Sequence, residues 1–155
     1  MADLDDGPKQ RPLPGEEVES AVLGLLPDEA FDLVLTHGLQ GEYTRHRRHE
    51  ETSRAVARLW RIGKILADEL WLFAYEDGEG HHVPRPIEGA HRRQQLTREV
   101  WQEKRRIVTD VYGFSTDSFE GRSAGDEEAF WCFRTTDEFD VWLDKGAKYE
   151  GPGPI

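Results

Sequence analysis

Apolar residues recur at helical spacing through the middle of the chain, and this periodicity restricts the fold more than any other feature. Steps of three or four residues place the side chains on one face of an amphipathic helix. We therefore predict a long helix that begins near Arg47 and ends near Glu69, followed by a hairpin over 70–76 and 81–84. An uninterrupted helix as far as Tyr75 is the alternative. The apolar series consists of Ala55, Leu59, Ile62, Leu66, Leu70 and Phe73.

Other segments also carry helical signals. The segments 16–26 and 27–38 predict a short helical hairpin, because Pro27 separates two apolar stripes and Gly38 suits a helix end. A second long helix is expected over 92–113, where apolar residues again share one face. The C-terminal helix has the clearest start: Thr135 is followed three residues later by Glu138, the capping-box spacing.

The run AFWCFR at 129–134 is continuous, apolar and of strand length, as in a buried strand. The sequence thus predicts an α+β fold with two long amphipathic helices against a small, three-stranded antiparallel sheet. A short N-terminal helical hairpin and a C-terminal helix complete it. We expect a single domain over 16–148, a disordered leader over 1–15 and a flexible tail over 149–155, because both ends are rich in Pro and Gly.

Composition narrows the class of protein. The chain has 155 residues, 37% of them hydrophobic and 33% charged, which fits one domain with a large polar surface. No apolar run is long enough to cross a bilayer, and the acidic start lacks the apolar core of a secretory signal. Cys132 is the only cysteine, so no internal disulfide is expected. We expect a cytoplasmic protein that has no membrane contact.

Charge is unevenly distributed along the chain. The net charge is −11, yet residues 37–107 hold 14 basic and 11 acidic residues while both flanking segments are acidic. Segregated charge favours electrostatic steering toward a charged partner. This pattern, together with the lack of a recognised catalytic motif, favours a non-enzymatic interaction or regulatory protein with a protein partner.

An arginine stripe is the candidate binding surface. At about 100° per residue, four arginines of the central helix fall within roughly 60° of one another, and two arginines of the second long helix share a face. Guanidinium groups hold carboxylates and phosphates bidentately, so an acidic or phosphorylated partner is expected. A solvated helix face and a nucleic-acid interface are the alternatives, and the acidic chain disfavours the latter. The arginines are Arg47, Arg54, Arg58, Arg61, Arg98 and Arg105.

A histidine-rich stretch, RHRRHEE at 45–51, suggests a different class of protein. His46, His49 and Glu50 would share a helix face, and such side chains are used as metal ligands and in acid–base catalysis. The stretch does not match HExxH, and no cofactor is predicted. A small enzyme with a His/Glu site is therefore the alternative function. Convergence of three imidazoles within about 4 Å of a common point would favour it over the arginine stripe.

Overall fold

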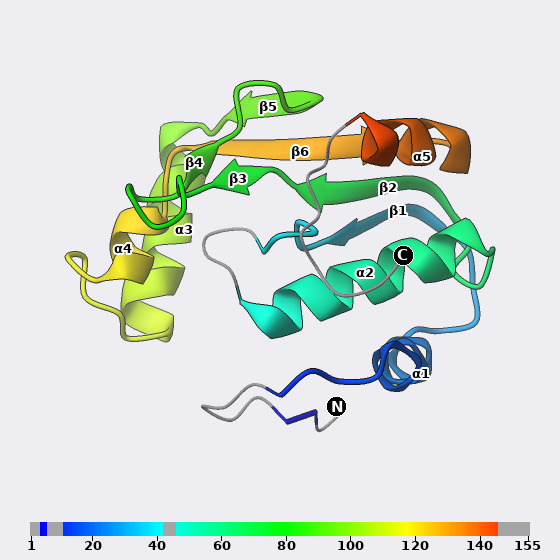
Figure 1. Cartoon of the computed structure of the whole chain (residues 1–155). Helices are drawn as coiled ribbons and strands as arrows, with labels where there is room; N and C mark the ends of the chain where they lie inside the picture. The colour runs from blue at the N-terminus through cyan, green and yellow to red at the C-terminus, as the bar shows by residue number, and fades with distance from the viewer. Residues whose placement is uncertain (1–3, 6–10, 42–45, 146–155) are drawn as a thin grey trace. The chain divides into compact units, whose positions relative to one another are not determined.

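The structure is a computed structural model that describes residues 4–5, 11–41 and 46–145 (Figure 1). The predicted flexible tail at 149–155 and most of the predicted leader lie outside these residues. The chain divides into two compact units. The first unit contains α1 (Gly15–Leu25), β1 (Phe31–Thr36), α2 (Arg47–Arg61), β2 (Ala67–Phe73) as far as Leu72, the end of β6 (Glu127–Phe133) and α5 (Thr136–Asp144).

The second unit spans residues 73–131 and holds short strands and helices. It comprises β3 (Tyr75–Glu76), β4 (Arg85–Pro86), β5 (Arg92–Gln95), α3 (Arg98–Arg106), a π-helical turn (Ile107–Val111), α4 (Phe119–Ser123) and most of β6. No helix in the described part of the chain is both long and apolar enough to span a membrane.

The four-stranded sheet has the order β1–β2–β6–β5, and β3 and β4 form a separate two-stranded ribbon. The α+β class is confirmed. The sheet is mixed, however, and the prediction of a wholly antiparallel sheet was wrong. β1 pairs with β2 in parallel, with Val34 opposite Leu70, whereas β5 pairs with β6 antiparallel.

The second half of the predicted N-terminal helical hairpin is the strand β1. Burial alternates over its last four residues: Leu33 and Leu35 are exposed, whereas Thr36 is buried and Val34 is half-buried. The backbone N–H of Phe31 donates to the carbonyl of Leu66 at 2.9 Å. The apolar spacing in this segment satisfies both periods, and pairing with β2 decides in favour of the strand.

Helix α2 ends at Arg61, eight residues earlier than predicted. Gly63 follows with a φ of +69°, a conformation that glycine adopts without strain. The N–H groups of Lys64 and Ile65 both donate to the carbonyl of Leu59, which closes the helix end. The chain then enters β2, and Ile62, expected in the core, is 58% exposed.

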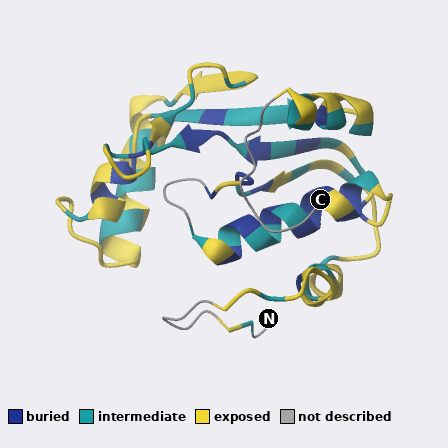
Figure 2. Cartoon of the chain, viewed as in Figure 1, coloured by how far each residue is buried: buried dark blue, intermediate teal, exposed yellow. Residues whose placement is uncertain are grey.

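The core of the first unit lies between α2, α5 and the sheet, and Figure 2 shows the buried positions concentrated on α2 and β2. Phe139 of α5 is fully buried, with its ring centroid 5.0 Å from that of Phe133 and 6.3 Å from that of Trp60. The indole N–H of Trp60 donates to the carbonyl of Ala67 at 3.1 Å. This bond fixes the end of α2 to the start of β2.

The C-terminal helix begins where the sequence predicts. The hydroxyl of Thr135 accepts a hydrogen bond from the N–H of Glu138 at 3.2 Å. The carboxylate of Glu138 in turn accepts from the N–H of Arg134 at 2.8 Å. The second bond reaches one residue further back than in the usual capping box, but both bonds occupy N–H groups near the start of α5.

In the second unit, the second long helix begins later than predicted. Residues 92–95 form β5, and the helix starts at Arg98, where the hydroxyl of Thr97 caps it. Gly113, with a φ of +77°, follows the π-helical turn near the predicted helix end. The predicted hairpin is reduced to β3 and β4, with Tyr75 opposite Pro86, so its second strand begins beyond 81–84.

Candidate functional site

Three imidazoles gather at the N-terminal end of α2. The rings of His37 and His49 are stacked, with centroids 4.0 Å apart and an interplanar angle of 3°. The ring of His46 lies against that of His49 at 4.5 Å and 45°. We call this group the histidine cluster, and all of it belongs to the first unit.

One buried hydrogen bond positions His37 next to the histidines of α2. His37 follows the last residue of β1, and the hydroxyl of Ser53 donates to the carbonyl of Gly38 at 3.0 Å. Ser53 is fully buried and lies one helical turn after His49. The bond therefore holds the segment after β1 against the face of α2 that carries His49.

Glu50 lies one turn after His46, which is the N-cap residue of α2. Glu50 is buried, and its carboxylate accepts a hydrogen bond from Arg54 at 2.8 Å. This is the ion pair expected for a Glu and an Arg four residues apart. Glu50 thus supplies a carboxylate on the same turn of helix as two of the three imidazoles.

Arg48, in the same turn of α2, is buried and had no predicted role. It forms an ion pair with Glu51 and donates to the carbonyls of Asp5 and Arg11, each at 2.6 Å. The carboxylate of Glu51 also accepts from the N–H of Leu13 at 3.1 Å. We call the Arg48–Glu51 pair the clamp, because it ties described residues of the leader to α2.

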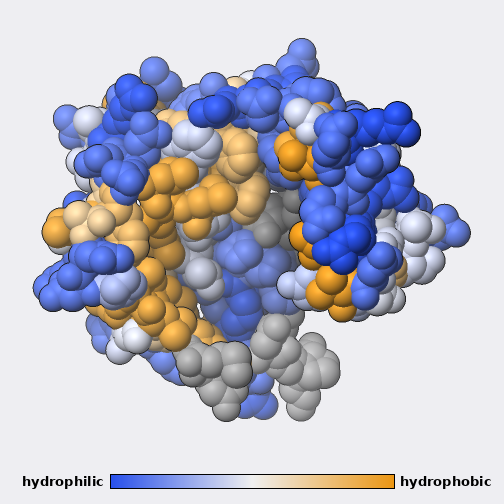
Figure 3. All heavy atoms as spheres, turned by 180° about the vertical axis from the view of Figure 1, so that it is seen from behind, coloured by the Kyte–Doolittle hydropathy of each residue, from blue (hydrophilic) through white to orange (hydrophobic). Residues whose placement is uncertain are grey.

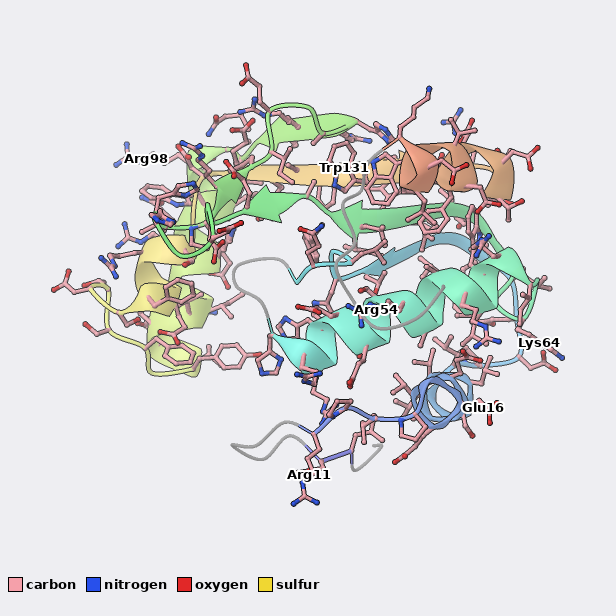
Figure 4. All side chains as sticks on the ribbon, viewed as in Figure 1. Arg11, Glu16, Arg54, Lys64, Arg98 and Trp131 are labelled. Atoms are coloured by element: carbon pink, nitrogen blue, oxygen red, sulfur yellow. The ribbon has the colours of Figure 1, made fainter. Side chains whose placement is uncertain are left out.

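Among the residues that the structure describes, three of the four predicted arginines on α2 form ion pairs with carboxylates. Arg54 pairs with Glu50, and Figure 4 shows Arg54 on α2. Arg58 pairs with Glu19 of α1 at 2.9 Å. Arg61 pairs with Asp140 of α5 at 2.8 Å. The fourth arginine, Arg47, is exposed.

The remaining predicted arginines, Arg98 and Arg105, lie on α3 in the second unit. Arg98 is exposed, and the guanidinium of Arg105 lies 5.2 Å from the ring centre of Trp101, within cation–π range. Glu99 follows Arg98. The pKa of Glu99 is lowered mainly by a hydrogen bond from the backbone N–H of Glu99 and, to a smaller extent, by one from the side chain of Thr97. That these two arginines act together with those of α2 stays a prediction.

The histidine cluster has chemistry that the arginines lack. An imidazole can give or accept a proton near neutral pH, and it is a common ligand of transition metals. Within residues 4–5, 11–41 and 46–145, no group of three His, Cys, Asp or Glu side chains is arranged to hold a metal ion. A metal would therefore require the stacked rings to turn.

In comparisons with known proteins, no family model, no curated protein and no solved structure matches this chain. Sequence reasoning identified His46, His49 and Glu50 but missed His37 and Arg48. His37 lies nine residues before His46, and only the path of the chain after β1 brings it to α2.

Proposed function

We propose that this chain is a small enzyme whose chemistry is centred on the histidine cluster, and that the imidazoles hold a divalent metal ion once the stacked rings of His37 and His49 have turned apart. The contact of His37, His46 and His49 carries the proposal. Glu50 lies on the same helical turn, and its carboxylate is held in the ion pair with Arg54. The single thiol, Cys132, is half-buried in β6. We also propose a cytoplasmic location.

The histidine cluster replaces the arginine stripe as the leading candidate site, because three arginines of the stripe are already paired with carboxylates. The stripe required guanidinium groups that are available together for a partner. Arg54, Arg58 and Arg61 each have a carboxylate within 3 Å, so a partner would have to compete with three existing ion pairs. The same competition weakens the nucleic-acid alternative, since phosphate binding depends on available cations.

Metal retention tests this proposal. After loading with zinc and dialysis, the purified chain is expected to keep about one ion, because imidazole nitrogens bind zinc strongly. His46→Ala and His49→Ala should each remove most of that zinc in elemental analysis. His81→Ala and His82→Ala are matched controls in the second unit and should retain it. Failure of the wild type to keep zinc, or equal retention by all variants, would contradict the proposal.

A second candidate is the interaction protein that binds an acidic or phosphorylated partner. The exposure of Arg47 and Arg98 favours it, because these two predicted arginines keep their side chains in water. In this case the chain would be non-enzymatic and would dock through exposed cations. The partner would be a protein segment rich in carboxylates or phosphates.

An acidic peptide tests this second candidate. Arg47→Glu should weaken binding of a fluorescent polyglutamate peptide by roughly fivefold in anisotropy at low salt, since an exposed pair contributes up to about 1 kcal/mol. Arg122→Glu, which changes an exposed arginine of α4, should leave the affinity unchanged. Equal losses in both proteins would indicate only a change in net charge, and the candidate would be rejected.

A further inference from the structure

A cleft lies beyond the C-terminal end of α2. It is bordered by the end of α1, the start of β1 and the turn between α2 and β2, all of which belong to the first unit. Its volume is about 420 Å³, within the range of small-molecule sites. The histidine cluster is at the other end of α2, about 20 Å away along the helix axis. The cleft is therefore a separate site, independent of the metal chemistry proposed above.

Apolar side chains form one part of the lining. Ile65 is 3% exposed and Phe31 is half-buried. Leu23 and Leu66 also line the cleft and are 39% and 57% exposed, so it is open to water. Figure 3 shows exposed apolar side chains on the face turned away from the viewer of Figure 1. An apolar group of a ligand would leave water on entering the cleft, which favours binding.

Charged side chains of both signs border the same cleft. Asp28 and Glu29 lie between α1 and β1, and Lys64 lies in the turn after α2. All three are exposed, and none of them forms an ion pair with another of the residues that the structure describes. Nearby on α2, by contrast, Arg58 and Arg61 each have a carboxylate within 3 Å. The cleft thus offers two carboxylates and one ammonium to a ligand.

The end of α1 adds a negative partial charge beside the two carboxylates. Its last turn contains no basic residue, and Leu23 and Leu26 of this end line the cleft. The last carbonyl groups of a helix have no partner within it, and this end attracts cations. A ligand's positive group is therefore favoured between α1 and β1, whereas Lys64 favours a negative group on the other side.

We propose that this cleft binds a free α-amino acid with an apolar side chain. The ammonium group of the ligand would pair with Asp28 and Glu29, its carboxylate would pair with Lys64, and its side chain would pack against Phe31 and Ile65. A simple organic anion would meet two carboxylates, and a simple amine would meet the ammonium of the lysine. A zwitterion complements the charges of both signs.

Titration with L-phenylalanine, followed through the backbone amide resonances of the ¹⁵N-labelled chain, tests the proposal. The resonances of Gly63, Lys64 and Leu66 are expected to shift with a dissociation constant on the order of 1 mM, as for a small ligand at an open site. Glycine, which has no apolar side chain to bury, should bind at least about tenfold more weakly.

Two ligand analogues and two variants assign the charges. Lys64→Met should weaken phenylalanine binding about fivefold but should not weaken binding of phenethylamine, which lacks the carboxylate. Asp28→Asn with Glu29→Gln should weaken phenylalanine binding by about fivefold or more, without weakening 3-phenylpropionate, which lacks the ammonium. The three side chains are exposed, so we expect both variants to fold.

Matched controls remove the same charges elsewhere in the first unit. Lys145→Met removes an exposed lysine at the end of α5. Glu16→Gln with Glu17→Gln removes two exposed carboxylates from the other end of α1, where Figure 4 labels Glu16. Both controls should leave the affinity for phenylalanine unchanged. The absence of saturable shifts in the cleft, equal losses in cleft and control variants, or phenethylamine binding as tight as that of phenylalanine would overturn the proposal.

Discussion

Replacing Arg48 with methionine is expected to lower the free energy of unfolding by about 3 kcal/mol, because it leaves the carboxylate of Glu51 buried without its cation. The side chains of Arg48 and Glu51 are each only 10% exposed. The substitution also removes two hydrogen bonds to the carbonyls of Asp5 and Arg11. Urea unfolding followed by circular dichroism measures the loss.

Two comparisons separate the clamp from a general effect of lost charge. Arg47→Met changes the exposed neighbour and should cost less than about 0.5 kcal/mol. Arg48→Met combined with Glu51→Leu should regain part of the loss, since an apolar pair can replace a buried ion pair. If Arg48→Met were as mild as Arg47→Met, the clamp would contribute little to stability.

Truncation of Phe139 to alanine is expected to cost about 4 kcal/mol, the range found for buried aromatic residues. Phe139 is fully buried and packs edge-on against Phe133 and Trp60. Its loss would open a cavity between α5, α2 and the sheet. Thermal and urea unfolding should both show the change.

Val141 provides the control on the same helix, because its side chain is 49% exposed. Val141→Ala should change the unfolding free energy by less than about 0.5 kcal/mol, and Phe139→Leu should cost less than Phe139→Ala because it leaves a smaller cavity. Similar values for Phe139→Ala and Val141→Ala would mean that α5 does not close the core of the first unit.

The predictions that the structure confirms depend on residues that are neighbours in the sequence. Thr135 and Glu138 act within one helical turn, so their spacing alone predicts the start of α5. β6 was predicted because the apolar run at 129–134 is continuous and of strand length. These features need no information from distant parts of the chain.

The predictions that failed depend on long-range pairing. The segment containing Val34 and Leu35 suits either a helix or a strand, and its parallel pairing with β2 involves residues more than 30 positions away. The early end of α2 depends on Gly63, whose positive φ was not anticipated. Ile62 and Leu66, which continued the helical period, are instead exposed.

The candidate site was only partly predictable for the same reason. His46, His49 and Glu50 lie within one turn of α2, and sequence spacing groups them. His37 joins them because Ser53 binds Gly38 across the fold. The partners of Arg58 and Arg61 lie on α1 and α5, so a helical wheel of α2 cannot show that these cations are already paired.

The imidazole nitrogen spectrum of the ¹⁵N-labelled chain, recorded by NMR before and after addition of zinc, tests the central claim most directly. The nitrogen resonances of His46 and His49 are expected to shift together as metal binds, while those of His81 and His82 stay in place. Unchanged resonances for His46 and His49, or shifts confined to His81 and His82, would contradict a functional site at the histidine cluster.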